Sequence, residues 1–268
     1  MKVKDGLFQC SVLFIFMVSC GEYQKIMKSE DYKMKFEAGM KYYSQGKCDK
    51  AYQLLEDCIP YYRGKEEYRE IIFALADCDM RDGNYETARE RYKYLSSLYA
   101  GTTVEEKALF YTVVCDYLLS NDYDLDSKNS IEAMSSASIF MIKFPNSPYA
   151  DSVKKIRNKL FDRKFRKEAE IAYLYYNMED YKASKASFMN LLEKYQNTYF
   201  GESEYFYLLS SAFLLAKNSS VEKQYERYRE FLDLFSLYHN FIKNKEYRSQ
   251  LKEYYNFAVE EIKKHDKR

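Results

Sequence analysis

The thiols and imidazoles are the side chains of this sequence that could do covalent or metal chemistry, and they are few. The chain has six cysteines and two histidines, and His239 and His265 lie near the C-terminus, far from every cysteine. No two cysteines have the C-x-x-C spacing of a zinc site, so we expect no metal ion and no other cofactor. The G-x-S-x-G, P-loop, G-x-G-x-x-G and H-E-x-x-H motifs are also absent, and we therefore expect no enzymatic activity.

Four cysteines follow residue 20, and two roles are open to them. Cys48, Cys58, Cys78 and Cys115 lie within apolar helical patterns, where cysteine commonly serves as a small hydrophobic residue. An export compartment would also permit disulfides. We expect the buried thiol role, and a disulfide remains the alternative.

The N-terminal segment predicts export. Lys2 and Lys4 precede an apolar run at residues 7–18 that has the length of a signal-peptide core and is too short to cross a membrane. Residues 1–19 are therefore predicted to be a signal peptide.

The end of that segment predicts lipidation. Ser19-Cys20, a small residue followed by cysteine, resembles the lipobox of bacterial lipoproteins, in which the cysteine is acylated and becomes the new N-terminus. We expect Cys20 to carry lipid such as palmitate and residues 20–30 to form a lipidated lead segment. Two or three acyl chains hold a protein stably at a membrane.

Composition favours helices and a protein partner. The 268 residues include 30 Tyr and 18 Phe but only 8 Gly and 3 Pro, which is too few for many tight turns between strands. The 42 basic residues nearly balance the 41 acidic residues, and nucleic acid is not an expected partner because it requires a basic excess.

The chain contains a helical repeat. Gly46 and Gly83 are 37 residues apart, and so are Ala51 and Ala88. Each Gly fits the turn of a tetratricopeptide-like helix pair, and each Ala fits the following helix. Later pairs are predicted at residues 105–119 and 130–144, 165–177 and 181–195, and 202–216 and 221–238, before a closing helix at 247–264. Residues 31–268 are thus predicted to be all-α, a right-handed superhelix of about five tetratricopeptide-like helix pairs with a C-terminal capping helix.

Several short segments, taken in order, resemble the BamD-like family of outer-membrane β-barrel assembly lipoproteins. They span about residues 20–240 and include Cys20-Gly21-Glu22-Tyr23, Arg63-Gly64, Phe144-Pro145-Asn146-Ser147 and Tyr181-x-Ala183. The resemblance implies a lipid-anchored protein on the periplasmic face of the outer membrane. It also implies two protein partners, the barrel insertase with its periplasmic domains and unfolded outer-membrane proteins, with the N-terminal repeats taking the client's C-terminal aromatic signal.

Two candidate binding sites follow from the repeat register. Positions on the first helix of each pair that face the concave groove are expected to bind the client, and these are Phe36, Met40, Tyr43, Phe73 and Met80. Residues 154–167 carry eight basic residues against one Asp, which indicates either a solvated helix face or a docking surface for an acidic domain. We assign docking to Arg157, Arg163 and Arg166.

Two other functions remain open. The chain could be a different periplasmic tetratricopeptide adaptor of the cell envelope, which would not bind the insertase. A glycan-binding lipoprotein of the starch-utilisation type is disfavoured, because such proteins hold sugars on Trp side chains and this sequence has no Trp.

Overall fold

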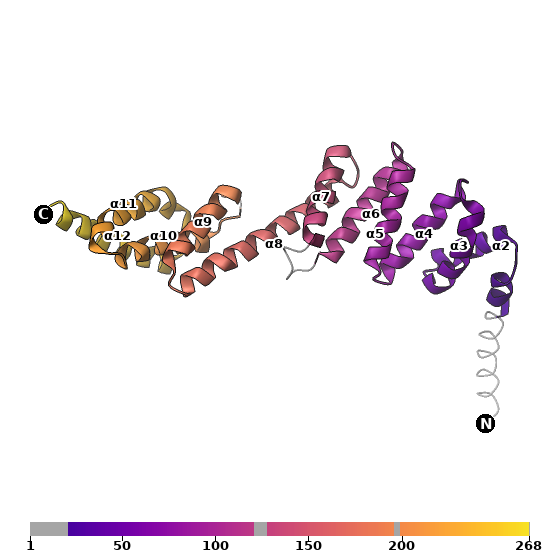
Figure 1. Cartoon of the computed structure of the whole chain (residues 1–268), viewed down its shortest axis with the longest axis horizontal. Helices are drawn as coiled ribbons and strands as arrows, with labels where there is room; N and C mark the ends of the chain where they lie inside the picture. Colours follow the sequence, from indigo (N-terminus) through magenta and orange to yellow (C-terminus); the bar gives the residue numbers. More distant parts are fainter. Residues whose placement is uncertain (1–20, 121–127, 196–198, 268) are drawn as a thin grey trace, which may run out of the picture. The chain divides into compact units, whose positions relative to one another are not determined.

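The computed structural model describes residues 21–120, 128–195 and 199–267 (Figure 1). Every regular element in these ranges is helical, which confirms the predicted all-α class. After a helical stretch at residues 21–27, the elements are α2 (Tyr32–Ser44), α3 (Cys48–Tyr62), α4 (Glu67–Arg81), α5 (Tyr85–Leu98), α6 (Thr103–Leu119), α7 (Lys128–Lys143), α8 (Ala150–Asn177), α9 (Tyr181–Tyr195), α10 (Glu202–Lys217), α11 (Val221–Tyr238), η1 (His239–Phe241) and α12 (Lys245–His265). The signal peptide and Cys20 lie outside the described residues.

The chain divides into two compact units, with the boundary between Arg157 and Asn158, inside α8. In unit 1, α2 packs on α3, α4 on α5 and α6 on α7, and successive pairs also pack on each other. In unit 2, α10 packs on α9, α11 and α12, and one large aromatic core joins them.

The turns within the first two pairs form as the sequence predicts. Gly46 and Gly83 have φ of 73° and 79°, a left-handed conformation that costs glycine little. The amide N–H of Lys47 donates to the Tyr42 carbonyl across the first turn, and that of Asn84 donates to Asp79 across the second. These bonds satisfy carbonyls that the helix ends leave open and direct the chain back into the next helix.

Close packing of α2 on α3 depends on Gly39, the small residue of the first pair. Gly39 is buried, and a Cβ atom there would lie 2.7 Å from Cδ2 of Leu55, a residue with no solvent exposure. The two helices therefore approach more closely than any larger side chain at position 39 would allow.

Helix α8 is longer than the sequence pattern indicated. We expected a helix to start at residue 165, whereas α8 covers 28 residues from Ala150. Its sequence has neither Gly nor Pro and is rich in Lys and Arg, which are good helix formers, so the basic stretch continues the helix instead of preceding it. No helix in the described ranges, α8 included, is both long and apolar enough to cross a membrane.

A disulfide joins the first two helix pairs. Cys48, at the start of α3, is bonded to Cys78 of α4, so the expectation of four buried thiols is wrong for this pair. The error arose because apolar periodicity marks burial but does not show which buried thiols meet. A cross-link closing a 30-residue loop stabilises a fold by ~3–4 kcal/mol in the chain-entropy model.

Cys58 and Cys115 are free and buried, and burial raises the pKa of their thiols to about 11 and about 12, so both stay protonated.

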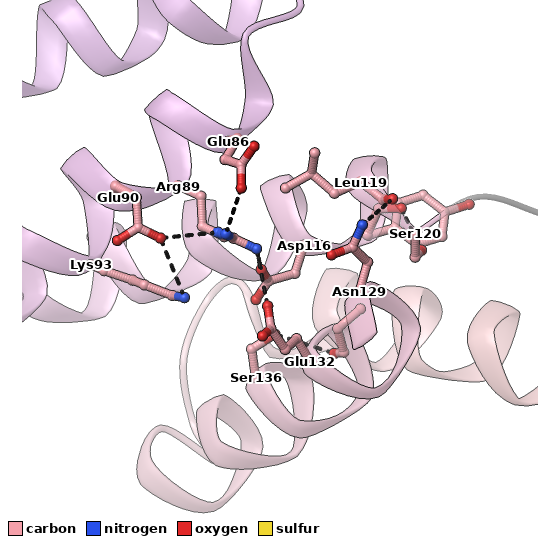
Figure 2. Close-up of polar contacts among 12 residues, drawn as sticks. Glu86, Arg89, Glu90, Lys93, Asp116, Leu119, Ser120, Asn129, Glu132 and Ser136 are labelled. Atoms are coloured by element: carbon pink, nitrogen blue, oxygen red, sulfur yellow. Dashed lines mark hydrogen bonds and ion pairs between the residues drawn. The ribbon is translucent and has the colours of Figure 1, made fainter. Parts of the chain in front are cut away.

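A buried arginine joins the second pair to the third. Figure 2 shows Arg89 of α5 among carboxylates from three helices. Its guanidinium lies 3.0 Å from Glu132 of α7 and 3.2 Å from Glu90, with Glu86 at 3.5 Å. The Asp116 carboxylate of α6, 2 % exposed, is 3.6 Å away, and burial raises its pKa above the usual value although Arg89 opposes this. Breaking such a pair is costly, because one charge would stay buried without compensation.

Replacing Gly39 with leucine tests the close approach of α2 and α3. We expect Gly39→Leu to lower the free energy of unfolding by about 1–3 kcal/mol, because the added atoms overlap Leu55. Glu37→Leu, at an exposed position of the same helix, should change it by less than about 0.5 kcal/mol. Urea denaturation measures both. In a Leu55→Ala background the Gly39→Leu penalty should shrink, and an unchanged penalty there would show that these residues do not meet.

Candidate protein-binding surface

The five residues assigned to client binding lie in unit 1 on α2 and α4, and all are half-buried. Each packs against the core of the first two pairs while leaving part of its surface to solvent: Phe36, Met40, Tyr43, Phe73 and Met80. They are therefore less exposed than groove positions were expected to be. Tyr43 and Phe73 meet in one cluster, whereas Phe36 packs instead on Tyr62 of α3, with ring centroids 5.2 Å apart.

Asp77 of α4 organises that cluster. Its carboxylate accepts hydrogen bonds from the hydroxyls of Tyr43 on α2 and Tyr92 on α5. Tyr92 has no solvent exposure, and burial raises the pKa of both hydroxyls far above the usual value, with the bond to Asp77 and its charge adding to the effect. Both tyrosines are therefore neutral donors at every physiological pH. One carboxylate of α4 thus fixes side chains from two neighbouring helices.

Aromatic rings extend this arrangement to α6. Tyr92 stacks on Tyr111 with centroids 5.0 Å apart and lies 5.9 Å from the ring of Phe73. We call Tyr43, Phe73, Asp77, Tyr92 and Tyr111 the Asp77 cluster. It combines half-exposed rings with one fully buried tyrosine that supports them.

Two exposed cations flank the Asp77 cluster. The Arg81 guanidinium lies 5.2 Å from the ring centre of Tyr43, and the Lys107 ammonium lies 4.8 Å from that of Phe73. Such contacts hold the long side chains over the rings. A surface of this kind suits a chain segment that offers an aromatic or apolar side chain together with a carboxylate.

Sequence reasoning missed Tyr111 and Lys107, and a signal for Tyr111 was present. Tyr43 and Asp77 are 34 residues apart, and Tyr111 follows Asp77 by the same interval. That interval is the usual tetratricopeptide period. The 37-residue spacing of the turn glycines, which set the predicted register, does not lead from Asp77 to Tyr111.

The basic stretch does not form one surface. Arg157 belongs to unit 1, whereas Arg163 and Arg166 belong to unit 2. Along α8, Arg157 and Arg166 are nine residues apart, which turns a helix through about 900° and places them on opposite faces. Arg166 pairs with Asp162 at 3.0 Å, one turn earlier on the same helix.

Metal ligation has no support in the described part of the chain. No three side chains among its histidines, cysteines, aspartates and glutamates are grouped so that they could hold a metal ion. The surface chemistry found there is that of aromatic rings, one shared carboxylate and flanking cations.

A family model described as YfiO, outer membrane lipoprotein, matches residues 28–228. A thermophilic tetratricopeptide repeat protein from Thermus thermophilus is 15% identical, with 83% of this chain and 98% of that chain covered and a TM-score of 0.35. A tetratricopeptide repeat protein from Parabacteroides merdae is 14% identical, with 86% and 100% covered and a TM-score of 0.40. Both TM-scores are low, and neither similarity bears on function. No curated protein matches the sequence.

Removing the shared carboxylate should destabilise unit 1. Asp77→Ala leaves the buried Tyr92 hydroxyl without an acceptor, and we expect a loss of about 1–3 kcal/mol in the free energy of unfolding. Tyr92→Phe should cost less in the Asp77→Ala background than in the parent, because the hydroxyl no longer has a partner to lose. Chemical denaturation of the four proteins gives the coupling energy. Equal costs of Tyr92→Phe in both backgrounds would rule out the bond.

Proposed function

Because this chain belongs to the YfiO family of outer membrane lipoproteins, we propose that it is a lipid-anchored scaffold of the outer-membrane protein assembly machinery. In this role it lies on the periplasmic face of the outer membrane, binds the barrel insertase and unfolded outer-membrane proteins, and catalyses no reaction. The observation that carries the proposal is the family match over residues 28–228, which extends from the lead segment to α11. A helical repeat with two separate candidate surfaces is consistent with a protein that holds two partners.

The client-binding surface of the proposal is the Asp77 cluster with Arg81 and Lys107. An unfolded outer-membrane protein that ends in an aromatic residue offers both a ring and a terminal carboxylate. The half-exposed rings of Tyr43 and Phe73 would contact the client's aromatic ring. The Arg81 and Lys107 cations would attract its terminal carboxylate. Met40 and Met80, also half-buried on α2 and α4, supply flexible apolar surface that suits clients of varied sequence.

The docking surface of the proposal is narrower than the sequence suggested. Arg163 and Arg166 are three residues apart on α8, within unit 2, so their side chains lie on neighbouring positions of one face. Arg157 lies on the opposite side of the helix from Arg166. We assign insertase docking to Arg163 and Arg166, and Arg157 serves as the comparison.

The client surface is tested with a peptide that ends in an aromatic residue. Combining Tyr43→Ser with Phe73→Ser should weaken its binding about tenfold, equivalent to ~1.4 kcal/mol, because two aromatic contacts are lost. Tyr61→Ser with Tyr94→Ser, which removes two exposed tyrosines outside the cluster, should leave affinity within about twofold of the parent. Fluorescence anisotropy measures the affinities, and thermal melts confirm folding.

Amidating the peptide terminus should weaken binding to the parent but have little effect in a Lys107→Gln, Arg81→Gln variant.

Variants of the α8 arginines test whether insertase docking is separate from client binding. Arg163→Glu with Arg166→Glu should reduce recovery of the insertase from solubilised membranes and leave peptide binding intact, and the parent's insertase binding should weaken with salt. Arg157→Glu should retain the insertase. If the parent itself recovers no insertase, the chain is a different envelope adaptor and the proposal fails.

The anchor is tested at Cys20. Because lipid is expected to be the membrane attachment, Cys20→Ala should move the protein from the membrane fraction to the soluble periplasmic fraction. Fractionation followed by immunoblotting measures the distribution. Intact-mass analysis of the native protein should show acyl chains on the first residue of the mature chain, and an unmodified N-terminus would contradict the proposal.

A further inference from the structure

A pocket of about 310 Å³ lies in unit 2, far along the chain from the Asp77 cluster. Phe235 near the end of α11 and His239 of η1 line one side, and the N-terminal half of α12 lines the other. Among the α12 residues in the lining are Lys245, Arg248 and Lys252. The proposed scaffold function makes no use of it.

The three cations of this pocket lack acidic partners. Lys245, Arg248 and Lys252 are exposed, and none of their side chains forms an ion pair within the described residues. Farther along the same helix, Lys264 pairs with Glu261 at 2.6 Å. No acidic side chain lines the pocket, so its positive charge is not neutralised from within.

The three cations lie in an electrostatically unfavourable position. They are spaced three and four residues apart, so they are neighbours on one helix face and repel each other. Lys245 and Arg248 also lie in the first turns of α12, at the positive end of the helix dipole. Glu246 is the acidic residue of that first turn, and Glu202 from α10 is occupied by the amide N–H groups of residues 243 and 244, at 2.9 and 2.6 Å. A bound anion would relieve both sources of repulsion.

The opposite wall is aromatic and fixed. The ring of His239 stacks on Phe235 with centroids 4.6 Å apart and planes 2° from parallel. Its Nδ1 donates to the Phe235 carbonyl at 2.7 Å, which sets the orientation of the imidazole. Leu251, 2 % exposed, contributes the apolar floor between the cations. The pocket therefore has one charged side and one flat apolar side.

We propose that the pocket between α11 and α12 binds a phosphate group. Three cations lining one pocket match an ion with up to two negative charges and several acceptor oxygens better than they match a single carboxylate, and the Arg248 guanidinium has the geometry for paired hydrogen bonds to phosphate. The aromatic wall would contact the carbon atoms that carry the phosphate. Two sources offer this chemistry, an anionic lipid headgroup and a soluble phosphate ester.

The test uses the mature chain from residue 20, with Cys20→Ser so that no lipid is attached. Glycerol 3-phosphate is titrated by calorimetry, and vesicles of phosphatidylcholine with or without phosphatidic acid are used in flotation assays. Arg248→Gln with Lys252→Gln removes two charges from the pocket. Lys263→Gln with Lys267→Gln removes two charges at and just beyond the C-terminal end of the same helix and is the matched control. All four changed residues are exposed, and thermal melts check folding.

The pocket variant should lose about tenfold in affinity for its phosphate ligand, and the control should stay within about twofold of the parent. Arg248→Lys should bind between the two, since it keeps the charge but not the paired hydrogen bonds. Binding of glycerol 3-phosphate alone identifies a soluble ester as the source, and binding of phosphatidic acid vesicles alone identifies a lipid. Equal losses in pocket variant and control, no binding of either probe, or tighter binding of a polyglutamate peptide would each overturn the proposal.

Discussion

The carboxylate of Asp77 is the acceptor on which the arrangement of unit 1 depends. A carboxylate that is partly withdrawn from water needs hydrogen-bond donors, and here two tyrosine hydroxyls from α2 and α5 supply them. The same bonds satisfy the hydroxyl of Tyr92, which has no access to water. Because α4 carries the acceptor and its neighbours carry the donors, the register of three helices is set at one point. The aromatic rings of the proposed client surface take their positions from that point.

Two further constraints surround this one. The disulfide between Cys48 and Cys78 joins α3 to α4, and Cys78 follows Asp77 directly in the sequence. Arg89 joins α5 to α6 and α7 through carboxylates of the second and third pairs (Figure 2). Each replaces apolar contact by a directional or covalent link that tolerates little sliding between helices. A binding surface assembled from several helices benefits from such links, since its side chains must be held in position before the ligand arrives.

Much of the fold follows from local sequence, and the site follows only in part. The turn glycines and helix periodicity place the pairs, and α9 and α11 have the predicted bounds, each beginning directly after a short polar stretch of sequence. The early start of α8 was missed, because its apolar positions Val153, Ile156 and Leu160 are interspersed with many Lys and Arg residues. The meeting of Cys48 with Cys78 and of Tyr92 with Asp77 depends on tertiary packing, which periodicity does not encode. Register predicted Tyr43 and Phe73 as binding residues, and the structure places both in one cluster, whereas Arg157 was grouped with Arg163 and Arg166 because spacing in sequence was taken for proximity on a surface.

Recognition is proposed to take place at two separate surfaces. Aromatic rings and cations on α2, α4 and α6 are proposed to receive unfolded chains, and charged residues of α8 are proposed to hold the insertase. The most direct measurement of the first claim is photocrosslinking in living cells, with a photoreactive amino acid in place of Lys107 beside Phe73, and separately in place of Tyr61 as the comparison. We predict that position 107 captures outer-membrane proteins and that position 61 does not. Equal capture at both positions, or none at 107, would contradict the assignment of the Asp77 cluster to client binding.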